Sequence, residues 1–212
     1  MESAADIARL YGTREVMDAL MHFVQGDVLD FGAGSGKQRK ALQAVAKSYT
    51  TLDIDPQPGV DIVGDVLNPP IADASYDTVV SNQVMEHVKE PWVMVEHVAR
   101  ILRPGGVCIL SAPFMAPFHA NPNDFFRFTE QGMQHLCRRA GLEVVLCTKH
   151  GGMWASVGET MKHRFFNPLN PQRSRLNKLL APRIERIFRF LNKLHRPGIV
   201  YNNVVCVARK PS

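Results

Sequence analysis

The stretch VLDFGAGSGK, residues 28–37, decides the fold of this chain. A short apolar run ends in Asp30, and a helix-forming segment, residues 38–46, follows the stretch. Between them lie three glycines at alternate positions, Gly32, Gly34 and Gly36. This order predicts a strand, a tight turn and a helix. Because glycine has no Cβ, its backbone can turn sharply and approach a ligand closely. The stretch therefore predicts a nucleotide-like ligand on the turn, near the free N–H groups of the following helix.

The spacing of the glycines disfavours two other nucleotide-binding motifs. The dinucleotide fingerprint G-x-G-x-x-G requires glycine at position 37, where this chain has Lys37. The phosphate-binding loop G-x-x-x-x-G-K-[ST] requires glycine at position 31 and a hydroxyl at position 38, where Phe31 and Gln38 stand. An NAD-dependent oxidoreductase is therefore the disfavoured alternative. The pattern that remains is acidic-x-G-x-G-x-G, beginning at Asp30.

Length and composition indicate one α/β domain over residues 1–212, with a helical segment, residues 1–24, predicted as an N-terminal lid. The first six residues lack the apolar core of a signal peptide and no run of eighteen apolar residues occurs, so we expect a cytoplasmic protein. The formal net charge is +5. The cysteines form no C-x-x-C pair, and we predict reduced thiols and no metal site.

Two later aspartates follow short predicted strands. Asp53 lies near the end of the second predicted strand, residues 49–54, about twenty positions after the glycines. A doubly wound fold holds ribose hydroxyls at this place. Asp55 is the alternate residue for that role. Asp65 follows a third strand, predicted over residues 61–63.

Together these motifs resemble the class I S-adenosylmethionine (SAM)-dependent methyltransferases, in particular the small ubiquinone-biosynthesis-type (methyltransferase type 11-like) branch. The resemblance covers residues 28–111. Besides the glycine stretch it rests on YDTVVSNQVMEHV, residues 76–88, and on LRPGG, residues 102–106. It implies a doubly wound seven-stranded α/β sheet of order 3-2-1-4-5-7-6, with the last strand antiparallel, in a three-layer sandwich.

The resemblance also implies SAM as the cofactor. It places the ribose at Asp53, and at Asp65 a carboxylate that accepts a hydrogen bond from the adenine amino group. Asn82 and Gln83, at the end of the fourth strand, are implied to face the sulfonium and amino-acid part. The predicted cofactor-binding residues are Asp30, Gly32, Gly34, Gly36, Asp53, Ile54, Asp65, Val66, Asn82 and Gln83.

The loop after the fifth predicted strand, residues 112–129, combines aromatic residues and prolines with His119, Asp124 and Arg127. Its pattern resembles methyltransferases of glycan and secondary-metabolite pathways, which implies a small-molecule or glycan-like acceptor, methylated at a hydroxyl oxygen. A hydroxyl benefits from a general base, and His119 is the candidate, with Asp124 orienting it. The alternative is that His119 caps the loop while Asp124 and Arg127 form an ion pair that holds it.

A helical insertion, residues 151–197, is predicted between the sixth strand and the last. Between residues 162 and 196 ten basic residues accompany a single acidic one, Glu185, and an apolar stripe follows a predicted helix start at Pro182. The helix could pack on the domain with a solvated basic face, lie on an anionic membrane surface, cover the active site, or bind an anionic acceptor. A SAM-binding protein without catalysis, acting through this insertion, is a further alternative. Nucleic acid is disfavoured, because no aromatic stacking platform accompanies the charges, and the oligomeric state is left open.

Overall fold

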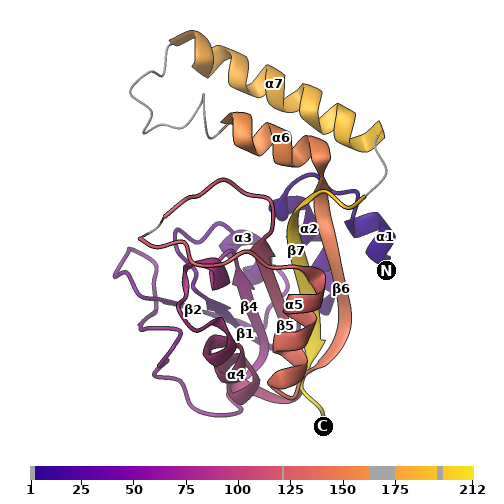
Figure 1. Ribbon diagram of the computed structural model, residues 1–212. Coiled ribbons are helices and arrows are strands. Elements are labelled where there is room, and N and C mark those ends of the chain that lie inside the picture. Colours follow the sequence, from indigo (N-terminus) through magenta and orange to yellow (C-terminus); the bar gives the residue numbers. More distant parts are fainter. Residues whose placement is uncertain (1–2, 121, 163–174, 195–197) are drawn as a thin grey trace.

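The computed structural model describes residues 3–120, 122–162, 175–194 and 198–212, and for residues 175–181 it describes only the helical backbone. Its centre is a seven-stranded sheet of order β3-β2-β1-β4-β5-β7-β6 (Figure 1). Strands β1 to β5 are parallel where they pair, and β7 is antiparallel to both β5 and β6. The strands are β1 (Asp27–Phe31), β2 (Ser48–Asp53), β3 (Ile62–Val63), β4 (Tyr76–Asn82), β5 (Leu102–Pro113), β6 (Glu143–Gly152) and β7 (Tyr201–Arg209). The predicted fold class and strand order are confirmed.

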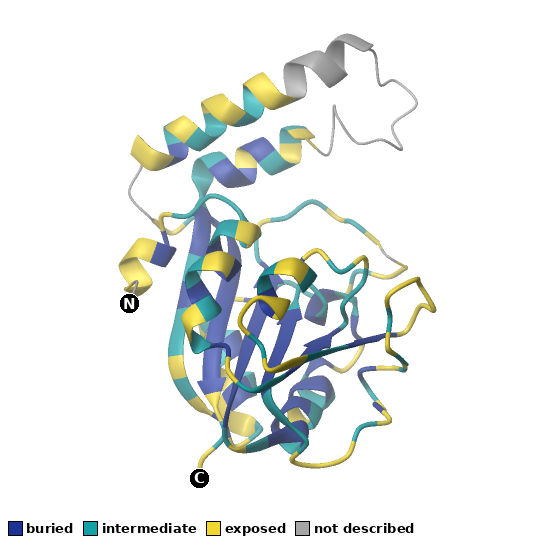
Figure 2. Ribbon diagram, turned by 180° about the vertical axis from the view of Figure 1, so that it is seen from behind, coloured by how far each residue is buried: buried dark blue, intermediate teal, exposed yellow. Residues whose placement is uncertain are grey.

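Helices cover both faces of the sheet and make it the middle of three layers. The helices are α1 (Ala4–Ile7), α2 (Thr13–Leu20), α3 (Arg39–Gln43), α4 (Pro91–Ile101), α5 (Glu130–Arg139), α6 (Met153–Met161) and α7 (Arg175–Leu194). Helices α4 and α5 pack on one face through buried side chains such as Met94 and Met133. Helices α1, α2 and α3 pack on the other through Ile7, Met17 and Leu42. Figure 2 shows the strands as the buried layer between them. Each such side chain, fully buried, contributes about 1.5–3 kcal/mol.

Local sequence explains where several helices begin. Pro91 stands at the start of α4, where its missing N–H loses no hydrogen bond. Thr129 caps α5, and its side-chain oxygen accepts a hydrogen bond from the Gly132 N–H at 3.0 Å. Helix α3 is shorter than the predicted 38–46, mainly at its C-terminal end, where it stops at Gln43 with Ala44 as its C-cap.

The insertion places α6 and α7 beyond the end of the sheet at which the parallel strands finish (Figure 1). The predicted helix start at Pro182 is wrong, since α7 begins at Arg175 and Pro182 lies inside it. Proline fixes φ at a helical value, so an interior proline removes a hydrogen bond without requiring the helix to end there. The rest of the insertion, residues 163–174 and 195–197, lies outside the described residues.

The N-terminal segment holds α7 in place. The Arg189 guanidinium forms ion pairs with Glu15 and Glu185 and lies 4.6 Å from the centre of the Tyr11 ring. The Asn192 side chain donates a hydrogen bond to the Arg9 carbonyl at 3.3 Å. The predicted lid segment therefore combines a helix in the core layer, α2, with contacts to the insertion. No described helix has both the length and the apolar character needed to cross a membrane.

Candidate functional site

The glycine turn after β1 has two differently packed glycines. Gly32, Gly34 and Gly36 all have positive φ, of 84°, 50° and 68°. A Cβ added at Gly32 would lie 2.6 Å from Cγ2 of Val84, whereas one added at Gly34 would meet no described atom within 4 Å. Gly32 is therefore required by packing, while Gly34 borders open space.

Asp53, at the end of β2, ties this turn to the neighbouring strand. Its Oδ2 atom accepts a hydrogen bond from the Gly34 N–H at 2.6 Å, and its Oδ1 atom accepts one from the Asp55 N–H at 3.0 Å. The side chain is buried, while the adjacent Ile54 is 61% exposed. Because a carboxylate oxygen can accept more than one hydrogen bond, Asp53 retains capacity for a ligand. This placement agrees with the ribose role predicted for Asp53, which stays a prediction.

Asp30 lies within β1 and is also buried. The Tyr49 hydroxyl on β2 donates a hydrogen bond to its Oδ2 atom at 2.7 Å. Burial raises the pKa of the Asp30 carboxyl to about 6, although the bond from Tyr49 opposes this rise. The hydrogen-bond partner of the Asp30 carboxyl is thus a residue of the neighbouring strand, Tyr49.

The remaining predicted cofactor residues lie at the same edge. Asp65, after β3, is exposed, and its Oδ1 atom accepts a hydrogen bond from the Leu67 N–H at 2.9 Å, while Val66 is buried. At the end of β4, Gln83 has a positive φ of 59°, and its side chain donates to Ser111 Oγ at 3.2 Å. Ser111 Oγ in turn donates to Asn82 Oδ1. Non-glycine residues in this conformation are strained and cluster at functional sites. The fold thus brings the ends of β1 to β4 together, as predicted.

Asp124 and Arg127 hold the loop that follows β5. They form an ion pair in which Arg127 Nη2 donates to Asp124 Oδ2 at 2.7 Å. The same carboxylate oxygen accepts the His119 backbone N–H at 2.9 Å, and Arg127 donates to the Pro117 carbonyl at 3.2 Å. The Arg127 guanidinium holds the pKa of Asp124 below its ordinary value. These are the contacts of the predicted alternative, in which the pair holds the loop; a catalytic role for either residue stays a prediction.

His119 faces a residue that the sequence analysis did not single out. Its Nδ1 atom lies 2.8 Å from the Pro117 carbonyl oxygen, and its Nε2 atom lies 3.7 Å from Oε1 of Glu86. Glu86 belongs to the 3-10 helix η2 (Met85–His87) after β4, and its side chain is fully buried. The Glu86 carboxylate raises the pKa of the His119 imidazole, against the effect of burial. The ring thus faces Glu86 and the Pro117 carbonyl, whereas Asp124 accepts the backbone N–H of His119, and the orientation of the ring by Asp124 stays a prediction.

Glu86 could have been noticed in the sequence only through its place in the Glu-His-Val run after β4. That run was used for the family resemblance, not for an acidic side chain. The loop reaches it through the backbone, because the Phe125 N–H donates a hydrogen bond to the Glu86 carbonyl at 2.7 Å. Tertiary structure alone joins residues 86 and 119.

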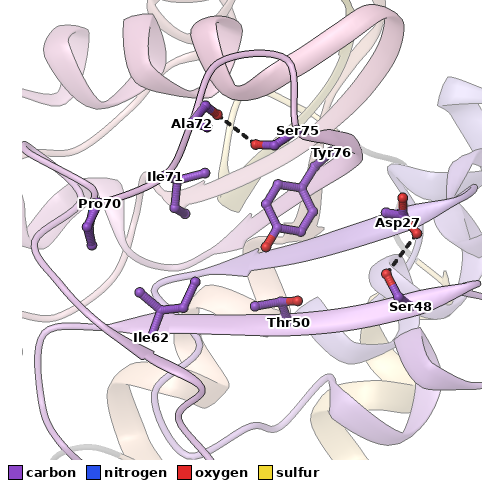
Figure 3. Close-up of a pocket in the computed structure, with 9 residues that line it drawn as sticks. All are labelled: Asp27, Ser48, Thr50, Ile62, Pro70, Ile71, Ala72, Ser75 and Tyr76. Atoms are coloured by element: carbon purple, nitrogen blue, oxygen red, sulfur yellow. Dashed lines mark hydrogen bonds between the residues drawn. The ribbon is translucent and has the colours of Figure 1, made fainter.

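A hollow of about 410 Å³ lies at the opposite edge of the sheet, where the parallel strands begin (Figure 3). It is lined by residues of the strand starts, such as Asp27 and Ser48, which hydrogen-bond to each other at 2.8 Å. Tyr76, at the start of β4, also points into it. None of the predicted site residues lines this hollow. Ligands of open α/β sheets bind beyond the carboxyl ends of the strands, so the glycine edge remains the candidate site.

Comparison with known proteins gives the class of this domain. Residues 29–110 match the family model described as a methyltransferase domain. A probable S-adenosylmethionine-dependent methyltransferase of Mycolicibacterium smegmatis is 34% identical over 151 residues, which cover 61% of this chain and 57% of that protein. The solved [4+2]-cyclase SpnF has a TM-score of 0.61 at 16% identity, covering 96% of this chain and 84% of that one. Phosphoethanolamine N-methyltransferase 2 of Haemonchus contortus, in complex with S-adenosyl-L-methionine, has a TM-score of 0.61 at 15% identity, covering 95% and 53%.

The fold, the glycine turn and the family match over residues 29–110 all agree with a class I methyltransferase domain. The family match over residues 29–110 and the curated relatives support the class I SAM-dependent methyltransferase superfamily that the motifs resemble, and they support S-adenosylmethionine as the cofactor. The chain spans 57% and 64% of the lengths of the first two curated relatives. The likeness to the two solved structures shows the fold alone, and a fold does not determine a reaction.

Proposed function

We propose that this chain transfers a methyl group from SAM to a hydroxyl oxygen of a small-molecule or glycan-like acceptor. The observation that carries the proposal is the open space beside Gly34, bordered by the carboxylate of Asp53. A Cβ-free turn next to a carboxylate with spare acceptor capacity suits the amino-acid and ribose parts of the cofactor.

SAM supplies an electrophilic methyl group on a sulfonium. Methyl transfer to oxygen forms a C–O bond, breaks the C–S bond and releases the hydroxyl proton. The chain mainly has to hold two reactants in line, and good orientation lowers a barrier by about 7–11 kcal/mol. The loop fixed by Asp124 and Arg127 lies on the acceptor side and presents His119, whose Nε2 atom is the ring nitrogen not directed at a backbone carbonyl.

Matched variants test the cofactor site. In Asp53→Ala, charge-assisted bonds worth about 1.5–3 kcal/mol are lost, so the dissociation constant for SAM should rise about 10- to 100-fold in calorimetry. The control, Asp55→Ala, removes an exposed carboxylate two residues away and should bind SAM as the parent does. If Asp55→Ala shows the larger loss, the ribose role belongs to the alternate residue.

The reaction itself is tested by release of S-adenosylhomocysteine with a panel of hydroxylated small molecules and sugars. We expect turnover with at least one hydroxyl-bearing acceptor and none with its O-methylated form. Tight SAM binding without turnover on any acceptor would instead favour the SAM-binding protein without catalysis. Preferential turnover of amines would contradict the oxygen assignment.

The outer face of α7 favours a second proposal, peripheral contact with an anionic membrane surface. Ile187, Phe190 and Leu194 are 57%, 62% and 69% exposed. Their spacing of three and four residues places them on one stripe of the helix. The exposed Arg183, Arg186 and Lys193 lie on the same helix. An apolar stripe beside basic residues is typical of helices that lie in a membrane interface.

Vesicle co-sedimentation tests this second proposal. Binding to vesicles with anionic phosphatidylglycerol is expected to exceed binding to pure phosphatidylcholine, and Phe190→Asp should weaken it. A matched control is Val145→Asp, an exposed apolar residue of β6 outside α7. Equal binding to both vesicle types, or no effect of Phe190→Asp, would contradict the proposal.

A further inference from the structure

Three potential metal ligands converge where the loop after β5 meets η2. Glu86, His87 and His119 each offer one ligand atom, and these atoms lie within 4.8 Å of one another. Both Nε2 atoms lie 3.7 Å from Oε1 of Glu86. The two imidazole rings meet edge to face, with their centres 5.2 Å apart. The residues come from two segments more than thirty positions apart, which only the fold brings together.

The second nitrogen of each imidazole is oriented by a backbone carbonyl. Nδ1 of His87 lies 2.6 Å from the Asn123 carbonyl oxygen, and Nδ1 of His119 lies 2.8 Å from that of Pro117. Because a carbonyl oxygen can only accept a hydrogen bond, the proton of a neutral ring belongs on Nδ1. The lone pair is then on Nε2, facing Glu86. Carbonyl groups that orient the ligating histidines in this way are typical of metal sites.

The carboxylate of Glu86 is fully buried without a hydrogen-bond partner on either oxygen among the described residues. A buried carboxylate without partners is unfavourable by several kcal/mol, so such groups are normally paired with a cation or coordinate a metal. With both rings neutral, three acceptor atoms therefore converge with no donor between them.

The spacing fits a metal ion better than direct hydrogen bonds. A hydrogen bond between nitrogen and oxygen needs about 2.7–3.2 Å, which is shorter than the 3.7 Å observed. Ligands at about 2.0–2.2 Å from a tetrahedral Zn²⁺ lie roughly 3.3–3.6 Å apart, so each of the two nitrogen–oxygen distances of 3.7 Å is within a few tenths of an ångström of that spacing, and all three atoms lie within 4.8 Å of one another. Two imidazoles and one carboxylate suit zinc and similar divalent transition metals rather than calcium or magnesium.

We propose that Glu86, His87 and His119 bind a divalent transition-metal ion at the acceptor side of the site. Three protein ligands leave at least one coordination position open, as catalytic zinc sites do. The side chains of His87 and His119 are 18% and 34% exposed, so that position is open toward the loop surface. Resting on the proposed function, the ion would bind the acceptor hydroxyl and ease release of its proton to water. His119 is then a ligand rather than the predicted base, and the expectation of no metal site is reversed.

Direct binding is tested first. Protein treated with a chelator and then freed of it is titrated with Co²⁺, followed by its visible absorption, and with Zn²⁺ in competition. We expect one equivalent to bind, with affinity at least tenfold weaker in Glu86→Gln and in His119→Ala. His135→Ala, which removes an exposed histidine on α5, should bind like the parent. Circular dichroism and SAM binding check that the variants are folded.

Two results would overturn the metal site. One is the absence of saturable Co²⁺ or Zn²⁺ binding to the folded parent. The other is binding that Glu86→Gln and His119→Ala leave unchanged, which would place the ion elsewhere. If protonated imidazoles pair directly with Glu86, saturable Co²⁺ or Zn²⁺ binding should be absent.

The activity assay separates this proposal from the proposed function. Methyl transfer that is lost in chelator and restored by Zn²⁺ or Co²⁺, with SAM binding unchanged throughout, supports the role of the ion. Undiminished transfer in the chelated protein removes that role while the methyltransferase assignment stands. Metal binding without transfer under any condition leaves the site standing and overturns the methyltransferase assignment.

Discussion

Two buried carboxylates at the same sheet edge have opposite surroundings. Asp53, after β2, accepts backbone hydrogen bonds on both oxygens, from Gly34 and Asp55. Glu86, after β4, is more deeply buried and has no hydrogen-bond partner on either oxygen among the described residues. The first is stable in the protein as it stands. The second has no such donors, and this difference separates the carboxylate proposed to bind the cofactor from the one proposed to bind a metal ion.

Asp30 provides an intermediate case, and the largest expected effect. Its carboxyl has a single partner, Tyr49, and burial raises its pKa to about 6 from 3.8. Because the folded protein holds this proton more tightly than the unfolded chain, the group's contribution to stability is lost as pH rises from about 4 to 6. The free energy of unfolding of the parent should therefore fall by about 3 kcal/mol between pH 4 and pH 8 because of this group. Asp30→Asn should remove that fall.

Urea denaturation at the two pH values measures this effect. Asp55→Asn, at an exposed position, serves as the control and should leave the pH dependence unchanged. An identical pH dependence in Asp30→Asn and the parent would show that Asp30 is ionised without penalty.

Isosteric amide substitutions should change stability in opposite directions at the two compared carboxylates. In metal-free protein, Glu86→Gln removes a buried unpartnered charge and offers N–H groups to the two imidazoles, so stability should rise by about 1–3 kcal/mol. Asp53→Asn turns an N–H group toward a backbone N–H donor and should lower stability by about 1–2 kcal/mol.

Chemical denaturation in the presence of chelator measures both values. Added Zn²⁺ should stabilise the parent and leave Glu86→Gln almost unaffected, because a ligand stabilises only the state that binds it. Destabilisation by Glu86→Gln in chelator would mean that the charge is already compensated within the protein.

His150 on β6 extends the comparison to a basic group. It is fully buried, neither ring nitrogen has a partner among the described residues, and burial lowers its pKa to about 3. The unfolded chain binds a proton near pH 6.5 and the folded protein does not, so stability falls as pH decreases below that value. The expected contribution is about 1.4 kcal/mol per pH unit.

His150→Leu should remove this contribution between pH 6.5 and 4.5, whereas His135→Ala, at an exposed position, should keep it. Thermal melts across that interval provide the measurement. A melt of His150→Leu that follows the parent at every pH would indicate that the folded protein already accommodates a charged imidazole.

The two glycines of the turn should differ in how much stability an alanine substitution removes. Gly34→Ala introduces a side chain at positive φ into open space, which is unfavourable by about 1–2 kcal/mol, and its methyl group enters the proposed cofactor site. Gly32→Ala meets the same strain and also the Val84 side chain. We expect the larger loss of thermal stability in Gly32→Ala. Among folded variants, the loss of SAM affinity should be specific to Gly34→Ala; unchanged affinity there would place the cofactor elsewhere.

Local patterns predicted most of the fold. Strand β4 ends at Asn82, as expected, and the starts of α4 and α5 depend on neighbouring residues, Pro91 and the Thr129 cap. Pro182 misled the prediction of α7, since a local helix-start signal does not reveal that the helix continues on its other side. The position of Asp53 beside the glycine turn could also be predicted, because the strand topology puts the end of β2 next to the end of β1.

The sequence alone determined the class of fold, the glycine turn and the edge of the sheet at which the cofactor is expected, since these follow from short-range patterns and one topology. Only the tertiary structure decided that Glu86 is buried without a partner and that His119 faces it. Their meeting depends on a loop that Asp124 and Arg127 fold back onto η2. Burial and distance between remote segments arise from packing, and no local pattern of residues encodes them.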